Sequence, residues 1–130
     1  MRVLVTGGAG FVGSACLRHL LAHGHEAIAF DNLCQGHAQA VPQGRLIVAD
    51  IADTQALVRA LRELKADAVM HFAAATYVGE SVANPEYHYR NNIGGTLSLL
   101  GAMREAGVKR MLFSSTCATA SSRFSGGLVK

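Results

Sequence analysis

The sequence predicts an α/β fold in which a doubly wound parallel sheet of about five strands carries helices on both faces. Two observations lead to this prediction. Short apolar runs alternate with segments of helical periodicity along the 130 residues, and a glycine-rich turn directly follows the first run. Strands that are apolar throughout are typical of parallel sheets covered on both sides. One domain of this length can bury a sizeable core.

Each predicted strand is a short apolar run that ends at a polar or glycine-containing segment. The first, VLV, stops at the sequence TGGAGFVG, and the last, KRMLFSS, ends in hydroxyl side chains. The alternation with helices predicts the strand order 3-2-1-4-5. The predicted strands cover residues 3–5, 27–30, 45–50, 67–74 and 109–115.

Helices are predicted where apolar residues recur three and four positions apart. The first runs from Phe11 to His23 and stops before Gly24, which is a common C-terminal signal. Asp53 is the expected N-cap of the second helix, which carries its apolar residues between positions 57 and 64.

A long third helix is predicted over residues 86–106, with Asn84 as its cap and Pro85 in its first turn. Glycine inside a helix costs about 1 kcal/mol relative to alanine. We therefore expect close packing against another surface at the three glycines of this segment, Gly94, Gly95 and Gly101.

Charge and composition exclude several classes of function. The net charge is +3, but the basic residues are scattered, tryptophan is absent and no basic run contains aromatic residues, so nucleic-acid binding is not expected. No apolar stretch is long enough for a signal peptide or a membrane span. Three cysteines without a C-x-x-C pattern indicate free thiols in a reducing compartment. We expect a cytoplasmic, soluble protein that does not interact with membranes.

The glycine-rich turn has the pattern of a phosphate-binding loop. Gly7 and Gly10 lie between the first strand and the first helix, and Gly13 lies in the first turn of that helix. Gly7, Gly10 and Gly13 give G-x-x-G-x-x-G, while Gly8, Gly10 and Gly13 also fit G-x-G-x-x-G. In such a turn the first glycine allows a positive φ, the middle one lets the backbone approach a pyrophosphate, and the last permits close packing of the helix. The amino end of the helix then offers free N–H groups and a partial positive charge to the phosphates.

An acidic residue follows the glycine turn at nearly the spacing expected for a dinucleotide site. Asp31 closes the second strand, and a carboxylate about 20 residues after the glycines accepts hydrogen bonds from an adenosine ribose. The next residues, NLCQGHAQA, contain no Lys or Arg to neutralise a 2′-phosphate. The pattern predicts a Rossmann-like fold that binds NAD rather than NADP.

A metal site is not expected. His19 and His23 are four residues apart on the first helix, but Leu20 occupies the position where a zinc-protease motif has Glu, and no third ligand is evident. His23 is better explained as a polar residue at a helix C-terminus. Cys117 has no evident His or Asp partner and is expected to be a buried small side chain rather than a nucleophile.

Several motifs in a fixed order carry a resemblance to a known family. They are TGGAGFVG, DNL at 31–33, AD with Ile51, HFAA followed by VGESV and NP over 71–85, NN with GT at 91–96, and FSSTCAT at 113–119. Over about residues 1–119 the chain resembles the extended short-chain dehydrogenase/reductase family and, within it, the UDP-glucose 4-epimerases. We therefore expect an NAD-binding Rossmann domain over residues 1–119 and an atypical tail over 120–130.

The resemblance implies residue roles at matching positions. Thr116 is expected to hydrogen-bond the 4-oxygen of a UDP-sugar, with Ser114 beside the nicotinamide. Besides the glycines, the implied NAD contacts are Phe11, Val12, Asp31, Asn32, Asp50, Ile51, Phe72, Ala73, Ala74, Thr76, Asn91 and Ser114.

The same resemblance implies a reaction and a partner. In the family, hydride moves reversibly between C4 of a UDP-hexose and NAD, and the Tyr of a Tyr-x-x-x-Lys helix is the base. Related nucleotide-sugar 4,6-dehydratases have an Asp-Glu pair just after the active-site Thr, where this chain has Cys117 and Ala118. This difference favours an epimerase. The long helix pairs across a dimer interface in the family, which implies a homodimer.

The sequence departs from the family pattern after Thr119. Four residues beyond Tyr77, Tyr87 and Tyr89 stand Ser81, Asn91 and Ile93, so no Tyr-x-x-x-Lys occurs. We expect the chain to be inactive alone, its UDP-sugar partner being bound by a C-terminal region it lacks. Two explanations stay open: a truncated or frame-shifted epimerase, or a non-catalytic NAD-binding module. Another nucleotide-sugar epimerase or dehydratase of the family is a further alternative.

Overall fold

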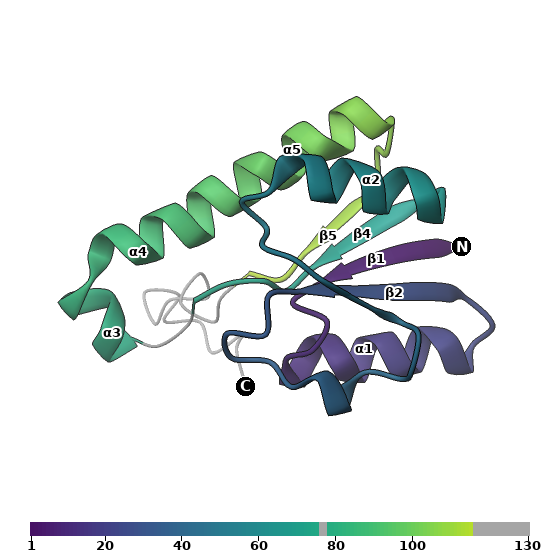
Figure 1. The fold of residues 1–130 in the computed structure, drawn as a ribbon, viewed down its shortest axis with the longest axis horizontal. Coiled ribbons are helices and arrows are strands. Elements are labelled where there is room, and N and C mark those ends of the chain that lie inside the picture. Colours follow the sequence, from purple (N-terminus) through teal and green to yellow (C-terminus); the bar gives the residue numbers. More distant parts are fainter. Residues whose placement is uncertain (76–77, 116–130) are drawn as a thin grey trace, which may run out of the picture.

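A computed structural model describes residues 1–75 and 78–115. Its centre is a parallel five-stranded sheet in the order β3-β2-β1-β4-β5, which confirms the predicted topology. All strand ladders are parallel, and all strands end on the same side of the molecule (Figure 1). The strands are β1 (Arg2–Thr6), β2 (Glu26–Asp31), β3 (Leu46–Val48), β4 (Ala68–His71) and β5 (Met111–Phe113).

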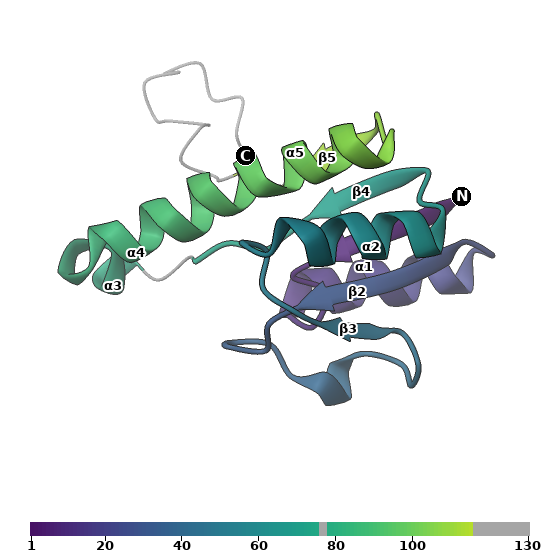
Figure 2. The same cartoon turned by 45° about the horizontal axis from the view of Figure 1, so that its top comes forward.

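Helices cover both faces of the sheet, as a doubly wound fold requires. Helix α1 (Phe11–Ala22) lies against one face, and α2 (Thr54–Leu64) and α5 (Gly95–Ala106) lie side by side on the other (Figures 1 and 2). A short 3₁₀ turn, η1 (Ala38–Ala40), lies in the connection to β3.

The sheet separates two hydrophobic clusters. Leu4, Phe30 and Val69 point toward α2 and α5, where they meet Leu57, Leu61 and Leu99, all almost completely buried. On the other face Val3, Val5 and Ala29 pack against Leu17 of α1. Successive residues of a strand point to opposite faces of the sheet, and both faces are covered by helices. The strands are therefore apolar on both sides.

The predicted helix caps are confirmed. The Asp53 carboxylate accepts a hydrogen bond from the Ala56 N–H at 3.0 Å, and α2 begins at the next residue. The Asn84 side chain accepts one from the Tyr87 N–H at 3.2 Å, and Pro85 is the first residue of α4 (Pro85–Tyr89). In each case the side chain satisfies an N–H that the helix itself leaves unpaired.

The strands are shorter than the apolar runs predicted, most clearly at β4. The run 67–74 was expected to be one strand, but the ladder between β1 and β4 ends where Thr6 pairs with His71. Gly7 then turns away with φ +69°, so Phe72, Ala73 and Ala74 have no neighbouring strand on that side. Strands β3 and β5 contain three residues each rather than the predicted runs 45–50 and 109–115. Each stops where its neighbour's ladder ends, at Asp31 for β3 and at His71 for β5.

The predicted long helix is present, but it is not uniform. Helix α4 continues through a π turn, η2 (Arg90–Gly94), into α5, and the three together form a rod whose α4 end projects past the sheet (Figure 1). A short helix not predicted from the sequence, α3 (Val78–Ala83), precedes it.

The expectation of close packing at the helical glycines is correct at one position only. A Cβ at Gly95 would lie 2.6 Å from the Cγ2 atom of Ile51, so this glycine allows α5 to approach the chain after β3. A Cβ at Gly94 or Gly101 would meet nothing within 4 Å. At these two positions the prediction is wrong for the single chain, because they lie on the face of the rod that points away from the sheet.

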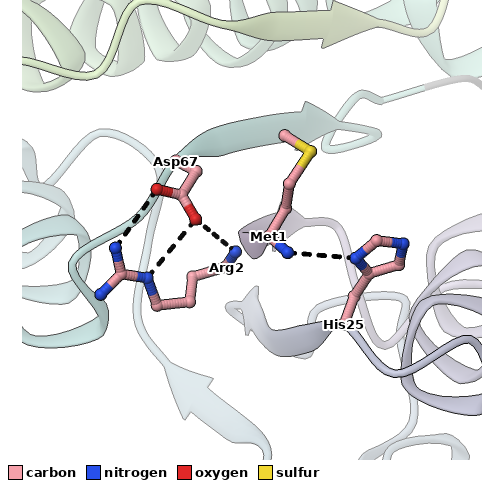
Figure 3. Close-up of polar contacts among 4 residues, drawn as sticks. All are labelled: Met1, Arg2, His25 and Asp67. Atoms are coloured by element: carbon pink, nitrogen blue, oxygen red, sulfur yellow. Dashed lines mark hydrogen bonds and ion pairs between the residues drawn. The ribbon is translucent and has the colours of Figure 1, made fainter.

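The starts of β1 and β4 are joined by polar side chains (Figure 3). The Asp67 carboxylate accepts hydrogen bonds from the Arg2 backbone N–H at 2.7 Å and from the Arg2 guanidinium at 3.2 and 3.4 Å. Together these Arg2 groups hold the pKa of Asp67 below its usual value of 3.8. Beside them the Met1 ammonium lies 3.2 Å from Nδ1 of His25.

Two further expectations concern cysteines and membranes. Cys16 and Cys34 are free, while Cys117 lies outside the described residues. In the part of the chain that the structure describes, no helix combines the length and hydropathy needed to cross a bilayer.

Candidate dinucleotide-binding site

A cleft of about 390 Å³ opens at the carboxyl ends of the strands. It lies where the chain order reverses between β1 and β4, which is where ligands bind in doubly wound sheets. Most of the residues predicted for the site lie together here. The predicted residues that line the cleft are Gly7, Gly10, Phe11, Val12, Gly13, Asp31, Asn32, Ile51, Phe72, Ala73, Ala74 and Asn91.

The glycine turn forms the floor of the cleft, and its geometry leaves no room for a Cβ at Gly7, Gly8 or Gly13. Gly7 has φ +69°, and a Cβ there would lie 2.7 Å from the backbone of Phe72 and Ala73. A Cβ at Gly13 would overlap the carbonyl of Gly7, so this glycine lets α1 pack directly on the turn. A Cβ at Gly10 would have only the Gly7 carbonyl oxygen nearby, at 3.3 Å, and would occupy space at the cleft.

The amino end of α1 points its backbone donors into this cleft. Gly10 is the N-cap and supplies no side-chain cap, and the first turn contains no acidic residue. The N–H groups at the start of a helix have no partner within the helix. They give this wall of the cleft a partial positive charge suited to an anion such as a diphosphate.

Asp31 is fixed at the end of β2 by two backbone hydrogen bonds. One carboxylate oxygen accepts from the Ala9 N–H at 3.0 Å, and the other accepts from the Leu33 N–H at 2.8 Å. The second bond closes a tight turn in which Leu33 has φ +61°. Each carboxylate oxygen has a further lone pair available for a ligand hydroxyl.

Asp50 reaches the site only through a neighbour. Its carboxylate accepts from the Ala52 N–H at 2.8 Å and from the Asn32 side-chain amide at 3.1 Å, and it does not itself line the cleft. The oxygen of the same Asn32 amide accepts from the Cys34 N–H at 3.0 Å. Asp50 therefore orients Asn32, while the buried Ile51 contributes an apolar surface.

The opposite wall is built by the π turn. Asn92 holds the backbone of Ala75 with two hydrogen bonds, accepting from its N–H at 2.7 Å and donating to its carbonyl at 3.0 Å. The Asn91 side chain lines the cleft and donates to the Asn92 side chain at 3.1 Å. Sequence analysis identified Asn91 and missed Asn92, although the adjacent pair of amides was a signal for both.

A buried histidine behind this wall was also missed. His71 is 3% exposed, and its two ring nitrogens lie 2.6 Å from the Thr6 hydroxyl and 3.1 Å from the Thr96 hydroxyl. Burial lowers the pKa of His71 below its ordinary value. The signal in the sequence was a lone histidine inside an otherwise apolar strand.

Three further predicted site residues are not among those that line the cleft in the described part of the chain. Ser114 follows β5 and donates its backbone N–H to the His71 carbonyl at 3.2 Å, but it is exposed and does not line the cleft. Thr76 and Thr116 lie outside the described residues. Within residues 1–75 and 78–115, no cluster of three or more His, Cys, Asp or Glu side chains is placed to hold a metal ion.

These features define a class of protein. A parallel sheet with this strand order, a glycine turn leading into α1 and an acidic residue ending β2 are those of a Rossmann-type α/β domain. The sequence profile described as the NAD dependent epimerase/dehydratase family matches residues 3–124, and the chain belongs to this family.

Individual relatives agree with this assignment. The chain is 48% identical over 120 residues to a UDP-glucose 4-epimerase from Streptomyces lividans, a match that covers 91% of this chain and 36% of the relative. It is 43% identical to a UDP-glucose 4-epimerase from Klebsiella pneumoniae, with 89% of each chain covered. The resemblance inferred from the sequence is thereby confirmed.

A solved structure shows the same fold. The UDP-glucose 4-epimerase from Stenotrophomonas maltophila, crystallised with NAD and formylated UDP-arabinopyranose, superposes with a TM-score of 0.88 at 40% identity. The match covers 91% of this chain and 38% of the other. The chain thus spans little more than a third of the length of this structure and of the Streptomyces relative.

Proposed function

We propose that this chain binds NAD and is the cofactor-binding portion of a UDP-glucose 4-epimerase. One observation carries the proposal: the glycine turn, the amino end of α1 and the Asp31 carboxylate face the same cleft. The relatives support it, since a similar epimerase was crystallised with NAD and a UDP-sugar.

The residues present fit the parts of the cofactor. Unpaired N–H groups in the first turn of α1 suit the diphosphate, and Gly10 leaves space for its approach. The free lone pairs of Asp31 suit the hydroxyls of the adenosine ribose. The further contacts we propose are Phe11, Val12, Asn32, Ile51, Phe72, Ala73, Ala74, Thr76 and Asn91. Asp50 acts through Asn32, and Ser114, which does not line the cleft, makes no contact in this proposal.

The same geometry supports NAD over NADP. A 2′-phosphate would lie against the negative charge of Asp31. The neighbouring residues on this side of the cleft, Cys34, Gln35 and Gly36, carry no positive charge to compensate. Desolvating a phosphate beside a carboxylate without a basic partner is strongly unfavourable.

The proposed reaction divides between the cofactor and the residues of the chain. Bound NAD supplies a reversible hydride acceptor. The chain's own residues bind and orient the dinucleotide, and we propose that Thr116 hydrogen-bonds the 4-oxygen of the UDP-sugar. The sequence contains no Tyr-x-x-x-Lys to supply a base, so we propose that these 130 residues bind NAD without turnover. The free thiols of Cys16 and Cys34 support a cytoplasmic location.

Calorimetry with the full chain tests this proposal. We expect NAD to bind, NADP to bind at least about tenfold more weakly, and UDP-glucose and UDP-galactose not to interconvert. Gly10→Ala keeps an ordinary backbone conformation but adds a methyl group in the cleft, so NAD affinity should fall about tenfold or more. Gly101→Ala, on the far side of α5, is the matched control and should bind like the wild type. A chain that does not bind NAD at millimolar concentration refutes the proposal.

We further propose that two copies pair through the outer face of the rod. Ile93, Leu97 and Leu100 recur at helical spacing and are 53, 63 and 46% exposed, with Gly94 and Gly101 beside them. Sedimentation at micromolar concentration should give a dimer, and Leu97→Glu should give a monomer. A wild-type monomer at that concentration contradicts the pairing.

A further inference from the structure

His71 occupies a junction between the two walls of the cleft. It is the last residue of β4, directly before the cleft-lining Phe72, and its register partner in β1 is Thr6, directly before Gly7. Its ring lies between the hydroxyls of Thr6 and Thr96, at 2.6 and 3.1 Å. Thr6 is fully buried, His71 nearly so and Thr96 half-buried, so the ring is largely shielded from solvent.

The hydrogen-bond partners determine where the protons are. The Thr96 hydroxyl donates to the backbone carbonyl of Asn92 at 2.6 Å, and a carbonyl can only accept. A hydroxyl has one proton, so Thr96 must accept from Nε2–H of His71. In the neutral ring Nδ1 is then the acceptor and receives the proton of Thr6. Burial, which disfavours the charged form, is consistent with a neutral ring.

This chain of bonds ends on the π turn. The Asn92 carbonyl belongs to η2, the segment in which Asn91 lines the cleft and Asn92 holds Ala75. A π turn departs from the regular i to i−4 pattern and occurs in proteins mostly as a single turn inside an α-helix, frequently at a functional site. Here the Thr96 hydroxyl bonds a carbonyl of that turn, and the bond from His71 fixes the direction in which that hydroxyl points.

We propose that His71, through Thr96, is a positioning residue that sets the π-turn wall of the cofactor cleft relative to the glycine turn. This inference rests on the proposed NAD binding. His71 and Thr96 do not line the cleft, so they act through Asn91, Asn92 and the backbone at residues 72–75.

Three variants test the positioning role. Thr96→Val removes the hydroxyl at nearly constant shape and should weaken NAD binding about tenfold in calorimetry. Thr96→Ser retains the hydroxyl and should restore wild-type affinity. Thr54→Val is the control: it removes a 2.7 Å hydroxyl pair between α2 and Ser98 of α5, and neither residue lines the cleft or bonds to the π turn in the described part of the chain. It should lower thermal stability while leaving NAD affinity unchanged.

The proton assignment is tested in the wild-type chain without any variant. Nitrogen NMR of the imidazole should show a neutral ring protonated at Nε2 at pH 7, and a ring protonated at Nδ1 or charged overturns the inference. Wild-type binding with equal affinity in Thr96→Val overturns the positioning role alone. If the wild type does not bind NAD, the proposed function fails and the positioning role fails with it.

Discussion

The carboxylate of Asp31 is held in place by the fold itself. Backbone N–H groups from the glycine turn and from residue 33 bind both of its oxygens. Because the fold already holds this carboxylate in one position, a ligand hydroxyl could bind it with little further loss of side-chain entropy, which is the advantage of preorganisation. The same bonds tie the glycine turn to the end of β2, so one residue fixes two segments that line the cleft.

His88 presents the opposite case: it is a buried polar side chain whose ring nitrogens lack hydrogen bonds in the part of the chain that the structure describes. It is 9% exposed, and neither ring nitrogen has a hydrogen-bond partner within residues 1–75 and 78–115. An unsatisfied buried group costs about 1–3 kcal/mol. We expect His88→Phe to raise the free energy of unfolding by an amount in this range, measured by urea denaturation, because an adjoining cavity of about 500 Å³ gives the larger ring room.

An exposed histidine is the control for this substitution. His37 lies on the surface, and His37→Phe should leave the free energy of unfolding within about 0.5 kcal/mol of the wild type. A His88→Phe chain less stable than the wild type would show that the ring has a partner which matters for folding.

Residues whose role depends on near neighbours in the sequence were predictable, and those paired over long distances were not. Asp53 and Asn84 cap helices that start one residue later, so local chemistry identified them. The partners of His71 are 65 and 25 residues away, and the Asp31–Ala9 bond depends on the path of a turn. No local pattern contains that information.

At the scale of the elements, the apolar runs predicted the existence of the strands better than their ends. A strand ends where its neighbour leaves the ladder, and for β4 that point is set by the glycine turn of β1. Residues 72–74, which follow the end of this ladder, then line the cleft. The π turn was not predicted either, because a helical pattern of apolar residues does not reveal one extra residue in a turn.

Two glycines of the same helix should respond oppositely to alanine. Gly95→Ala places a methyl group 2.6 Å from Ile51 and should lower the free energy of unfolding by about 1–3 kcal/mol. Gly101→Ala meets nothing within 4 Å and should raise it by about 0.5–1 kcal/mol, because alanine favours the helix. Urea denaturation of dilute protein measures both. Equal effects of the two substitutions would contradict the close approach of α5 to Ile51.

At the scale of the molecule, the order of the strands could be predicted and the function of the wall behind the cleft could not. Alternating strands and helices leave few ways to build a doubly wound sheet, and the glycine turn marks the first strand. The sheet then brings the ends of β1, β2 and β4 to one place, so most predicted site residues meet. Ser114 was an exception, since the short β5 ends away from the cleft.

The opposite end of the sheet is held by the ion pair of Arg2 and Asp67, which joins the starts of β1 and β4 (Figure 3). The pKa of Asp67 is lower in the folded chain than its ordinary value of 3.8 because the Arg2 groups favour the charged carboxylate. The stabilisation is therefore complete at pH values above 3.8 and is lost as the pH falls through the lower folded value.

Asp67→Asn should reduce the free energy of unfolding modestly at pH 7, and the difference from the wild type should shrink below pH 4. Glu105→Gln removes a more exposed pair with Arg62 and should change stability less at every pH. Urea denaturation between pH 2.5 and 7 measures both, and a constant difference for Asp67→Asn across that range would mean that the carboxylate charge does not hold the two strands together.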